Sequence, residues 1–506
     1  MQPDSPIRPP QEIELKLALP TSDASRLAKQ LARVPVLARR RASHQHLRNI
    51  YYDTPEQLLR QQRIALRIRR TGTETEPQWL QTLKTGGSSN SALSQRGEWE
   101  TSVPDGALAL EALQATPWSG LDPDGAVFRA LAACFVTSFE RTSWSVRRRD
   151  GGLIEVALDI GHIAAGDRVA PICELELELK AGQPAALFDL AQQIARTIAV
   201  LPANQSKAER GYALAQDGLD RALGAQPPKL SHDLSLSAAA GRVLGEMFGQ
   251  FSTNLNALCR SDHPELLHQA RVGWRRFKSG LRLFKSSLAA DAIPSWQALQ
   301  PLLGLMGALR DIDVALHDTL PPLAKAYTAG DARRVAAWEA MTKDLLQAAT
   351  LQRQSVRYAL QVPTVGAALL ATAEWLESLS ALTGPGDARG GRGVPLRRWA
   401  RRRMERLHER LKLAAKDTRH PDGQHRLRIL AKRMRYGIEA LQTLLPKQRT
   451  QRWHLQATRL QTGLGAARDV LQASRLAAQL EADGQLVEFL RGVAVGQSRR
   501  GPQNNA

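Results

Sequence analysis

Residues 12–16 read Glu12-Ile13-Glu14-Leu15-Lys16, in which charged and apolar side chains alternate. Successive side chains of a β-strand point to opposite faces, so the charged residues share one face and the apolar residues share the other. Seven further strand-like runs follow, separated by turn residues: 49–54, 65–70, 78–84, 95–103, 141–149, 153–163 and 172–180. Together the eight runs predict an antiparallel sheet or barrel. Helical patterns at 22–33, 108–113, 126–135 and 185–199 predict flanking helices.

The charged face of these strands carries both signs. Its carboxylates are Glu12, Glu14, Asp159, Glu174 and Glu176, and its cations are Lys16, Arg67, Arg69, Lys84, Arg141, Lys207 and Arg210. In an open sheet this would be the solvated face, whereas in a closed sheet it would line a lumen. Cations pair with phosphate oxygens, and hard carboxylate ligands hold Mg²⁺ or Mn²⁺. The mixture therefore favours metal-assisted phosphoryl or nucleotidyl transfer.

The N-terminal runs resemble the CYTH superfamily, the triphosphate tunnel metalloenzymes. Residues 12–16 match its ExExK signature, and the later motifs fall in the family's order: Tyr51-Tyr52-Asp53-Thr54, Leu66-Arg67-Ile68-Arg69, Thr82-Leu83-Lys84, Glu98-Trp99-Glu100, Leu158-Asp159-Ile160-Gly161, Glu174-Leu175-Glu176 and Ser206-Lys207. The resemblance implies an eight-stranded antiparallel tunnel with flanking helices that binds a triphosphate with a divalent cation.

The same resemblance implies roles for individual residues. The metal ligands would be Glu12, Glu14, Glu174 and Glu176, with help from Asp159, and the phosphate oxygens would be held by Arg67, Arg69, Lys84, Arg141, Lys207 and Arg210. Lys16 would lie near the terminal phosphate, so Lys16, Glu12 and Glu14 are the predicted catalytic residues. We interpret Glu98, Glu100 and Glu178 as structural ion-pair partners rather than further lumen ligands.

Net charge differs between the two parts of the chain. Residues 1–220 contain 26 Lys and Arg against 26 Asp and Glu, whereas residues 221–506 contain 43 against 23. The formal charge of +20 therefore belongs to the C-terminal part and implies an anionic partner there. No run reaches the ~18 apolar residues of a membrane span. The three cysteines lack CxxC spacing and no apolar leader opens the chain, so we expect a cytoplasmic protein.

Beyond a Pro-bearing polar stretch at 224–233, the pattern changes to amphipathic helices and contains a repeat. His263-Pro264-Glu265 recurs as His420-Pro421-Asp422, and most of the basic residues that follow recur at the same offset. These basic residues are His268, Arg271, Arg275, Arg276, Lys278 and Arg282 in the first copy, and His425, Arg428, Lys432, Arg433 and Arg435 in the second. All but Arg276 of the first set fall within an arc of about 80° on a helix. Duplication of this basic stripe favours a binding surface over a merely solvated helix face.

Two facing basic stripes suit a linear polyanion, and their few aromatic residues favour a phosphate polymer over nucleic acid. The repeat, followed by Arg310-Asp311-Ile312-Asp313, resembles the CHAD family of conserved histidine α-helical domains. This resemblance implies two pseudo-symmetric helical bundles that bind inorganic polyphosphate. The second copy reads Arg468-Asp469-Val470-Leu471 and lacks the second Asp, so we interpret this loop as a structural brace.

The predicted organisation is a tunnel domain at 8–215, a linker at 216–235, a first helical bundle at 236–382, a Gly/Pro-rich linker at 383–395, a second bundle at 396–495 and a disordered tail at 496–506. The predicted reaction is hydrolysis of inorganic triphosphate to pyrophosphate and phosphate with Mg²⁺ or Mn²⁺. The helical part is predicted to bind polyphosphate and to associate with polyphosphate granules, and no specific nucleic acid is predicted as a partner. Two alternatives stay open: a class IV-type adenylate cyclase, and a non-enzymatic polyphosphate-binding or granule-associated adaptor.

Overall fold

The computed structural model describes residues 11–20, 23–73, 75–87, 92–219, 221–381, 395–416, 421–463 and 466–499. His420, Gly465 and most of the Gly/Pro-rich stretch 383–395 lie outside this part of the chain. The chain forms two compact units. The first contains residues 1–222 together with 360–375, and the second contains 223–359 and 376–506.

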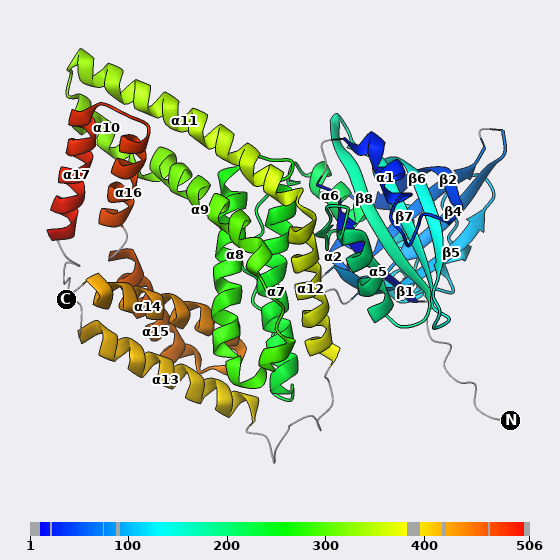
Figure 1. Ribbon diagram of the computed structural model, residues 1–506. Helices are drawn as coiled ribbons and strands as arrows, with labels where there is room; N and C mark the ends of the chain where they lie inside the picture. Colours follow the sequence, from blue (N-terminus) through cyan, green and yellow to red (C-terminus); the bar gives the residue numbers. More distant parts are fainter. Residues whose placement is uncertain are drawn as a thin grey trace. The chain divides into compact units, whose positions relative to one another are not determined.

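The first unit is a closed antiparallel barrel, and Figure 1 shows its strands curving around a common axis. Its strands are β1 Gln11–Ala18, β2 Ala42–Asp53, β3 Ala65–Gly72, β4 Pro77–Lys84, β5 Leu93–Val103, β6 Ala132–Arg147, β7 Leu153–Ala165 and β8 Arg168–Ala181, with a short β9 at Leu201–Pro202. The strand order is β5-β4-β3-β2-β6-β7-β8-β1, and β1 pairs again with β5. The first half of β1 pairs with β5 and its second half with β8, which closes the sheet.

The eight strands predicted from the sequence are confirmed, in the predicted order. The helix predicted at 126–135 is wrong in its second half, because α4 covers only Ala126–Arg129 and β6 begins at Ala132. Phe135 stacks on Tyr51 of β2 with ring centroids 4.6 Å apart. Burial of this ring against the neighbouring strand outweighs the local helical pattern.

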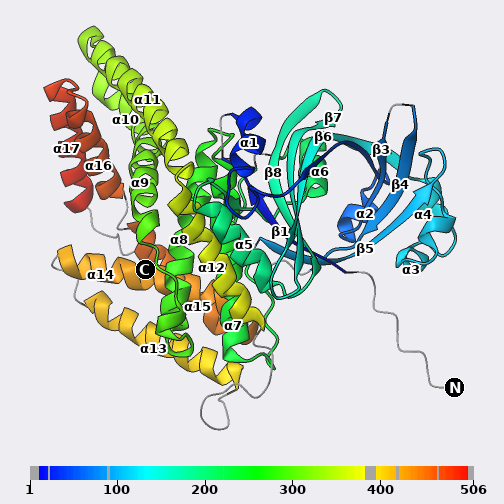
Figure 2. The ribbon, with the colours of Figure 1, turned by 45° about the vertical axis from the view of Figure 1, so that its right-hand side comes forward.

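Helices cover parts of the barrel, and one of them, α6, contributes side chains to its interior. These are α1 Leu27–Leu31, α2 Leu58–Gln61, α3 Trp118–Leu121, α4 Ala126–Arg129, α5 Ala185–Ala195 and α6 Lys207–Ala215. Leu59 of α2 and Trp118 of α3 pack with Leu83 of β4 in one apolar cluster. Figure 2 labels α2, α3 and β4 in this part of the barrel. Tyr212 of α6 joins a second cluster with Tyr51 and Phe135. Short helices therefore fix the barrel wall, and α6 carries Lys207 to its lumen.

The second unit is helical, and no strand lies among its described residues. Its helices are α7 Leu236–Ala257, α8 Pro264–Leu283, α9 Gln300–Val314, α10 Pro321–Thr328, α11 Ala332–Leu360, the end of α12 Pro363–Ala381, α13 Leu396–Lys416, α14 Pro421–Leu441, α15 Lys447–Gly463, α16 Ala466–Gln479 and α17 Gly484–Arg499. Both copies of the repeat thus start a long helix with Pro in the first turn, α8 at Pro264 and α14 at Pro421. No described helix has the length and apolar character needed to cross a membrane.

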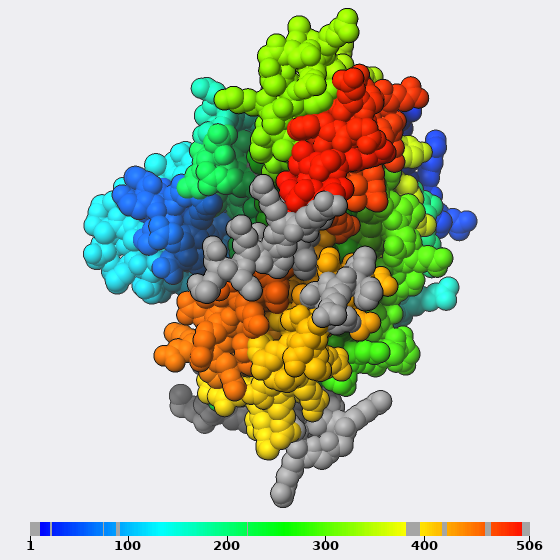
Figure 3. Space-filling model, turned by 90° about the vertical axis from the view of Figure 1, so that its left-hand side faces the viewer, coloured from blue at the N-terminus to red at the C-terminus, as the bar shows by residue number. Residues whose placement is uncertain are grey.

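The two halves of the helical unit contact one another. Helix α14 packs against α8, and α16 packs against α9 and the π-helical turn Ala315–Thr319 that follows it. Tyr327 of α10 lies 5.2 Å from Phe489 of α17 between ring centroids. In Figure 3, α16 and α17 (red) adjoin the yellow-green segment that contains α10 and α11. Helices that correspond in the two copies of the repeat, α8 with α14 and α9 with α16, therefore pack against one another.

Candidate functional site

The lumen of the barrel is a cavity of about 1040 Å³. Nine of the residues predicted from the sequence line it: Glu12, Glu14, Lys16, Arg67, Arg69, Lys84, Arg141, Glu176 and Lys207. Asp159, Glu174 and Arg210 are buried beside it. Lys207 contacts both carboxylates of this second group, and Arg210 donates to Glu174 at 3.2 Å. The structure therefore brings all twelve predicted residues to one region of the first unit.

Three carboxylates form a compact group at the wall of the lumen. Asp159, Glu174 and Glu176 each offer an oxygen, and these oxygens lie within 4.8 Å of one another. Strand pairing places them, because Asp159 of β7 stands opposite Glu174 of β8, and Glu176 follows two residues later on the same face. Carboxylate oxygens are the ligands that Mg²⁺ and Mn²⁺ prefer. This group fits a divalent cation.

Three cations surround the carboxylate group. Lys207 Nζ lies 2.6 Å from Asp159 Oδ2 and 2.9 Å from Glu176 Oε1. Arg141 donates two hydrogen bonds of 2.7 Å to Asp159 and one of 2.6 Å to Glu176. Lys16 Nζ lies 2.8 Å from Glu176 Oε1. Burial alone would raise the pKa of Glu176, but Lys16, Lys207 and Arg141 outweigh it and hold that pKa well below its usual value.

Arg96 of β5 is a lumen residue that sequence reasoning missed. Its Nε donates to Glu12 at 2.8 Å and its Nη2 donates to Glu14 at 2.7 Å. Lys84 donates to both oxygens of Glu12 at 2.8 Å. Burial opposes ionisation of Glu12, yet these two cations keep its pKa below the usual range. Arg96 stands two residues before Glu98 on the same strand face, so the alternation that continues to Glu100 was the available signal.

Glu98, Glu100 and Glu178 also line the lumen, and two of them form ion pairs. Glu98 lies 3.0 Å from Lys84 and 3.8 Å from Arg67, and Glu178 lies 2.6 Å from Lys180. Burial raises the pKa of Glu178. Arg69 donates to Asn49 at 2.9 Å, and burial together with Arg67 and Arg141 lowers its pKa to about 10. Glu98 and Glu178 are thus ion-pair partners, as predicted, and all three glutamates also line the lumen.

The basic stripes of α8 and α14 lie near one another in the helical unit. Arg275 is exposed on α8, and its charge lowers the pKa values of Arg428 and Lys432 on α14. For Lys432, burial is the first cause, followed by Arg428 and Arg275, and its pKa falls to about 8. Arg271 lies against Gly307 of α9, where a Cβ would come within 3.3 Å of its Nη1. A dense positive patch therefore joins the two copies of the repeat.

Arg276 differs from the other residues of the predicted stripe because it is fully buried. Its guanidinium donates to the carboxylate of Glu246 on α7 at 2.9 and 3.0 Å and lies 3.5 Å from Glu439 on α14. The angle of Arg276 on the helix falls outside the arc of its neighbours, which turns it into the core. It braces three helices and is not available to a ligand.

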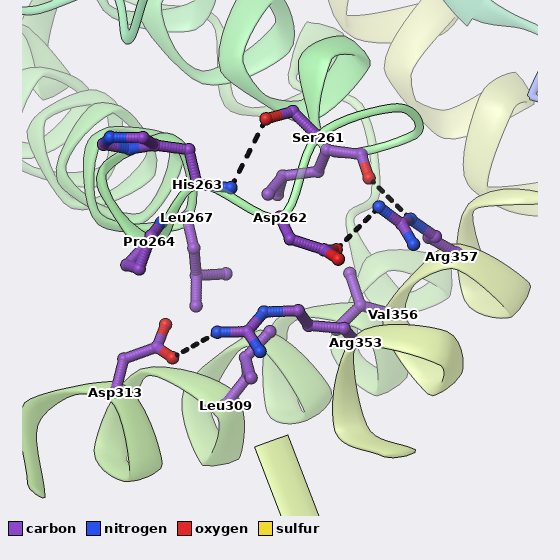
Figure 4. A pocket seen from close by; sticks show the side chains of 11 residues that line it. Ser261, Asp262, His263, Pro264, Leu267, Leu309, Asp313, Arg353, Val356 and Arg357 are labelled. Atoms are coloured by element: carbon purple, nitrogen blue, oxygen red, sulfur yellow. Dashed lines mark hydrogen bonds and ion pairs between the residues drawn. The ribbon is translucent and has the colours of Figure 1, made fainter. Parts of the chain in front are cut away.

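The Arg310-Asp311-Ile312-Asp313 segment lies beside a small crevice that Figure 4 shows from close by. Arg353 of α11 donates to Asp313 at 2.8 Å, and Arg357 pairs with Asp262 at 2.7 Å. His263 caps α8 by accepting from the backbone N–H of Glu265 at 3.2 Å. The crevice measures about 10 Å³, which holds no more than a water molecule. Asp313 is thus braced by Arg353, whereas Arg310 contacts Asp318 at 3.4 Å.

Family models match both units of the chain. Residues 10–212 match the CYTH domain and residues 242–478 match the CHAD domain. The chain combines a CYTH domain with a CHAD domain. The barrel and its lumen belong to the CYTH domain, and the repeat with its two basic stripes belongs to the CHAD domain.

Individual relatives resemble one or the other part. An inorganic triphosphatase of Haemophilus influenzae is 37% identical over 213 residues, which are 40% of this chain and 55% of the relative. The chain therefore spans about half the length of this curated relative. A CHAD domain from Ricinus communis is 26% identical, with 56% of this chain and 93% of that one covered and a TM-score of 0.47. A putative adenylyl cyclase from Hippeastrum, described as having a dominant triphosphatase activity, is 19% identical, with 40% and 95% covered and a TM-score of 0.29.

Proposed function

We propose that this protein is a divalent-metal-dependent inorganic triphosphatase whose CHAD domain binds inorganic polyphosphate. The observation that carries the proposal is the lumen, in which carboxylates and cations from β1, β3–β8 and α6 face one another. A relative with 37% identity is named an inorganic triphosphatase, which supports the same chemistry for the tunnel.

The cations of the lumen are paired with carboxylates, and a phosphate substrate can replace these carboxylates as the partners of the cations. Lys84 is neutralised by Glu12, and Lys207 by Asp159 and its neighbours. A triphosphate offers oxygens that take the place of these carboxylates on the cations. The carboxylates released in this way are then free for a cation of their own. Binding of a metal–triphosphate complex thus explains why one cavity contains both cations and carboxylates.

Each group of residues has a proposed role. Arg67, Arg69, Lys84, Arg96, Arg141, Lys207 and Arg210 hold phosphate oxygens, directly or through the wall of the lumen. Asp159, Glu174 and Glu176 hold the divalent cation, Mg²⁺ or Mn²⁺, and Glu12 and Glu14 complete the acidic side of the site. When bound, the cation supplies charge neutralisation and an activated water. Lys16, next to Glu176, stabilises the charge on the terminal phosphate.

The CHAD domain supplies a separate surface for a longer phosphate chain. In the patch formed by Arg275, Arg428 and Lys432, burial and the neighbouring cations lower the pKa values of Arg428 and Lys432, and an incoming polyanion relieves this repulsion. The aromatic residues of α8 and α14 are Trp274, Phe277 and Tyr436, and all three are buried, so they do not present rings for base stacking. We propose polyphosphate as the ligand, with association with polyphosphate granules as its consequence.

A substrate and metal panel tests the proposal. Purified full-length protein is incubated with triphosphate, ATP or long-chain polyphosphate, with Mg²⁺, Mn²⁺ or chelator, and phosphate, pyrophosphate and cyclic AMP are measured. A triphosphatase releases phosphate and pyrophosphate from triphosphate only when a divalent cation is present. Formation of cyclic AMP from ATP would identify a cyclase instead. Polyphosphate binding without turnover of any substrate would identify an adaptor.

A further inference from the structure

We propose that Arg60 and Arg63 form a rim subsite that binds the fourth and later phosphates of a linear polyphosphate whose end occupies the tunnel. This inference rests on the proposed triphosphatase function and extends its substrate class from triphosphate to longer inorganic chains.

The two arginines lie together at one edge of the lumen. Both line the main cavity, Arg60 from α2 and Arg63 from the turn that follows it. Buried Asp53 holds α2, because its carboxylate accepts backbone N–H groups of Leu59 at 2.8 Å and of Arg60 at 3.0 Å. The Arg60 guanidinium lies 5.5 Å from the ring centre of Tyr212 on α6. The rim is therefore a fixed part of the fold.

The rim arginines differ from the interior cations in their pairing. Lys16, Lys84 and Arg141 each contact a carboxylate within 2.8 Å. Among the described residues, Arg60 and Arg63 form no ion pair; Arg60 donates to the neutral side-chain oxygen of Gln57 at 2.7 Å. Their charges are therefore available to phosphate without displacement of an acidic partner.

Arg60 also lines an outer hollow. It lines a second cavity of about 490 Å³ together with Gln57, Gln61 and Gln216. A chain that leaves the lumen past Arg60 enters a hollow walled mainly by uncharged amides, with Glu56 as its acidic residue. Because Arg60 lines both cavities, the outer hollow offers room for phosphates beyond those held inside the barrel.

The charges along the lumen give the chain a direction. Tyr212 packs on Phe135 near the first residues of β6, whereas Glu155 stands opposite Ser145 near its last residues. Glu155 and Glu178 share Lys180, at 3.9 and 2.6 Å, so carboxylates outnumber cations in this group. An extended phosphate chain is repelled from that end and attracted to the rim of Arg60 and Arg63. Its reacting terminus then points inward.

The test compares linear triphosphate and tetraphosphate as substrates of the full-length protein, with kcat/KM measured from initial rates for each. In the Arg60→Gln/Arg63→Gln variant, we expect the ratio of kcat/KM for tetraphosphate to that for triphosphate to fall about tenfold. Arg48→Gln is the matched control, because it removes one exposed arginine from β2 at a position that does not line the cavity. The Arg60→Lys/Arg63→Lys variant should retain most of the ratio, since it keeps both charges.

Three outcomes are distinguishable. A fall in the ratio with unaltered thermal unfolding supports the rim subsite. A ratio equal to that of the Arg48→Gln control overturns the subsite and leaves the triphosphatase proposal standing. Absence of turnover of either substrate by the unmodified protein overturns the triphosphatase proposal and the subsite with it.

Discussion

Arg96 Nη2 lies 2.7 Å from Glu14 Oε1 at the seam where β5 closes on β1. Because Arg96 also binds Glu12, its replacement leaves two buried carboxylates with less compensation and removes a cation from the lumen. We expect Arg96→Gln to lower kcat/KM for triphosphate by about 10- to 100-fold, the range for a lost hydrogen bond to a charged group. Steady-state kinetics measure this, with Arg48→Gln as the control for loss of one arginine. Equal activity of the two variants would contradict the assignment.

The division of labour between the domains predicts that turnover and polyphosphate binding separate. The Glu12→Gln/Glu14→Gln double variant should lose triphosphate turnover, because both residues line the lumen of the CYTH domain. Its affinity for long-chain polyphosphate should stay close to that of the unmodified protein, since the basic patch belongs to the CHAD domain. Turnover assays and titration with labelled polyphosphate measure the two effects. A parallel loss of both would show that one site performs both tasks.

Stability of the tunnel should fall in acid. The pKa values of Glu12, Glu174 and Glu176 are lowered in the folded protein, where burial is outweighed by nearby cations. Their stabilising contribution is complete above the unfolded pKa of about 4.3, and it is lost as the pH falls through the lower folded values. The melting temperature, measured from pH 7 to pH 2, should decrease steadily below about pH 5. Glu176→Gln should make this dependence shallower, and an unchanged slope would argue against the pairing.

The basic patch of the CHAD domain should govern polyphosphate affinity. Replacement of Arg271, Arg275, Arg428 and Lys432 by Ala removes four cations from α8 and α14. We expect weaker binding and a flatter dependence of log affinity on log salt concentration, by about 0.7 to 0.9 per lost phosphate contact if the polymer behaves as nucleic acid does. Binding titrations at several salt concentrations measure both. Unchanged affinity would mean that these residues are merely solvated.

Lys432 should take up protons when polyphosphate binds. Its pKa of about 8 results from burial and from Arg428, Arg275, Arg468 and Arg435, so part of the population is neutral at pH 8.5 in the free protein. A bound phosphate raises that pKa and draws a proton from the buffer. Calorimetric titrations in two buffers with different ionisation enthalpies should therefore give different heats. In Lys432→Arg this difference should shrink while binding persists; an undiminished difference would place the proton elsewhere.

Much of the CYTH domain was predictable, because the alternation in residues 12–16 returns in β3, β5 and β8 and assigns a charged face to the lumen. The role of Arg96 was not, since its partnership with Glu12 depends on the closure of β5 on β1, a pairing between segments about 80 residues apart. Local periodicity predicts a helix over residues 132–135, because it contains no information about the stacking of Phe135 on Tyr51 of the neighbouring strand.

In the CHAD domain, the duplicated stripe was visible because helix periodicity places its members on one face. Arg276 belongs to the repeat because it recurs as Arg433, although its angle on the helix lies outside the arc of the stripe. Its buried partner, Glu246 on α7, could not be predicted from residue spacing within α8. The docking of α16 on α9 also depends on long-range packing rather than on any local pattern.

The strand that carries Glu12, Glu14 and Lys16 is also the strand that closes the barrel. During synthesis it emerges before the other strands of the barrel, yet its second neighbour is complete only after Glu178 has left the ribosome. More than 160 further residues must therefore be synthesised before the side chains of residues 12–16 can contact their partners on β8. A ribosome-bound fragment that ends before β8 has the residues of the signature without the site, so activity would report that the chain has closed on itself.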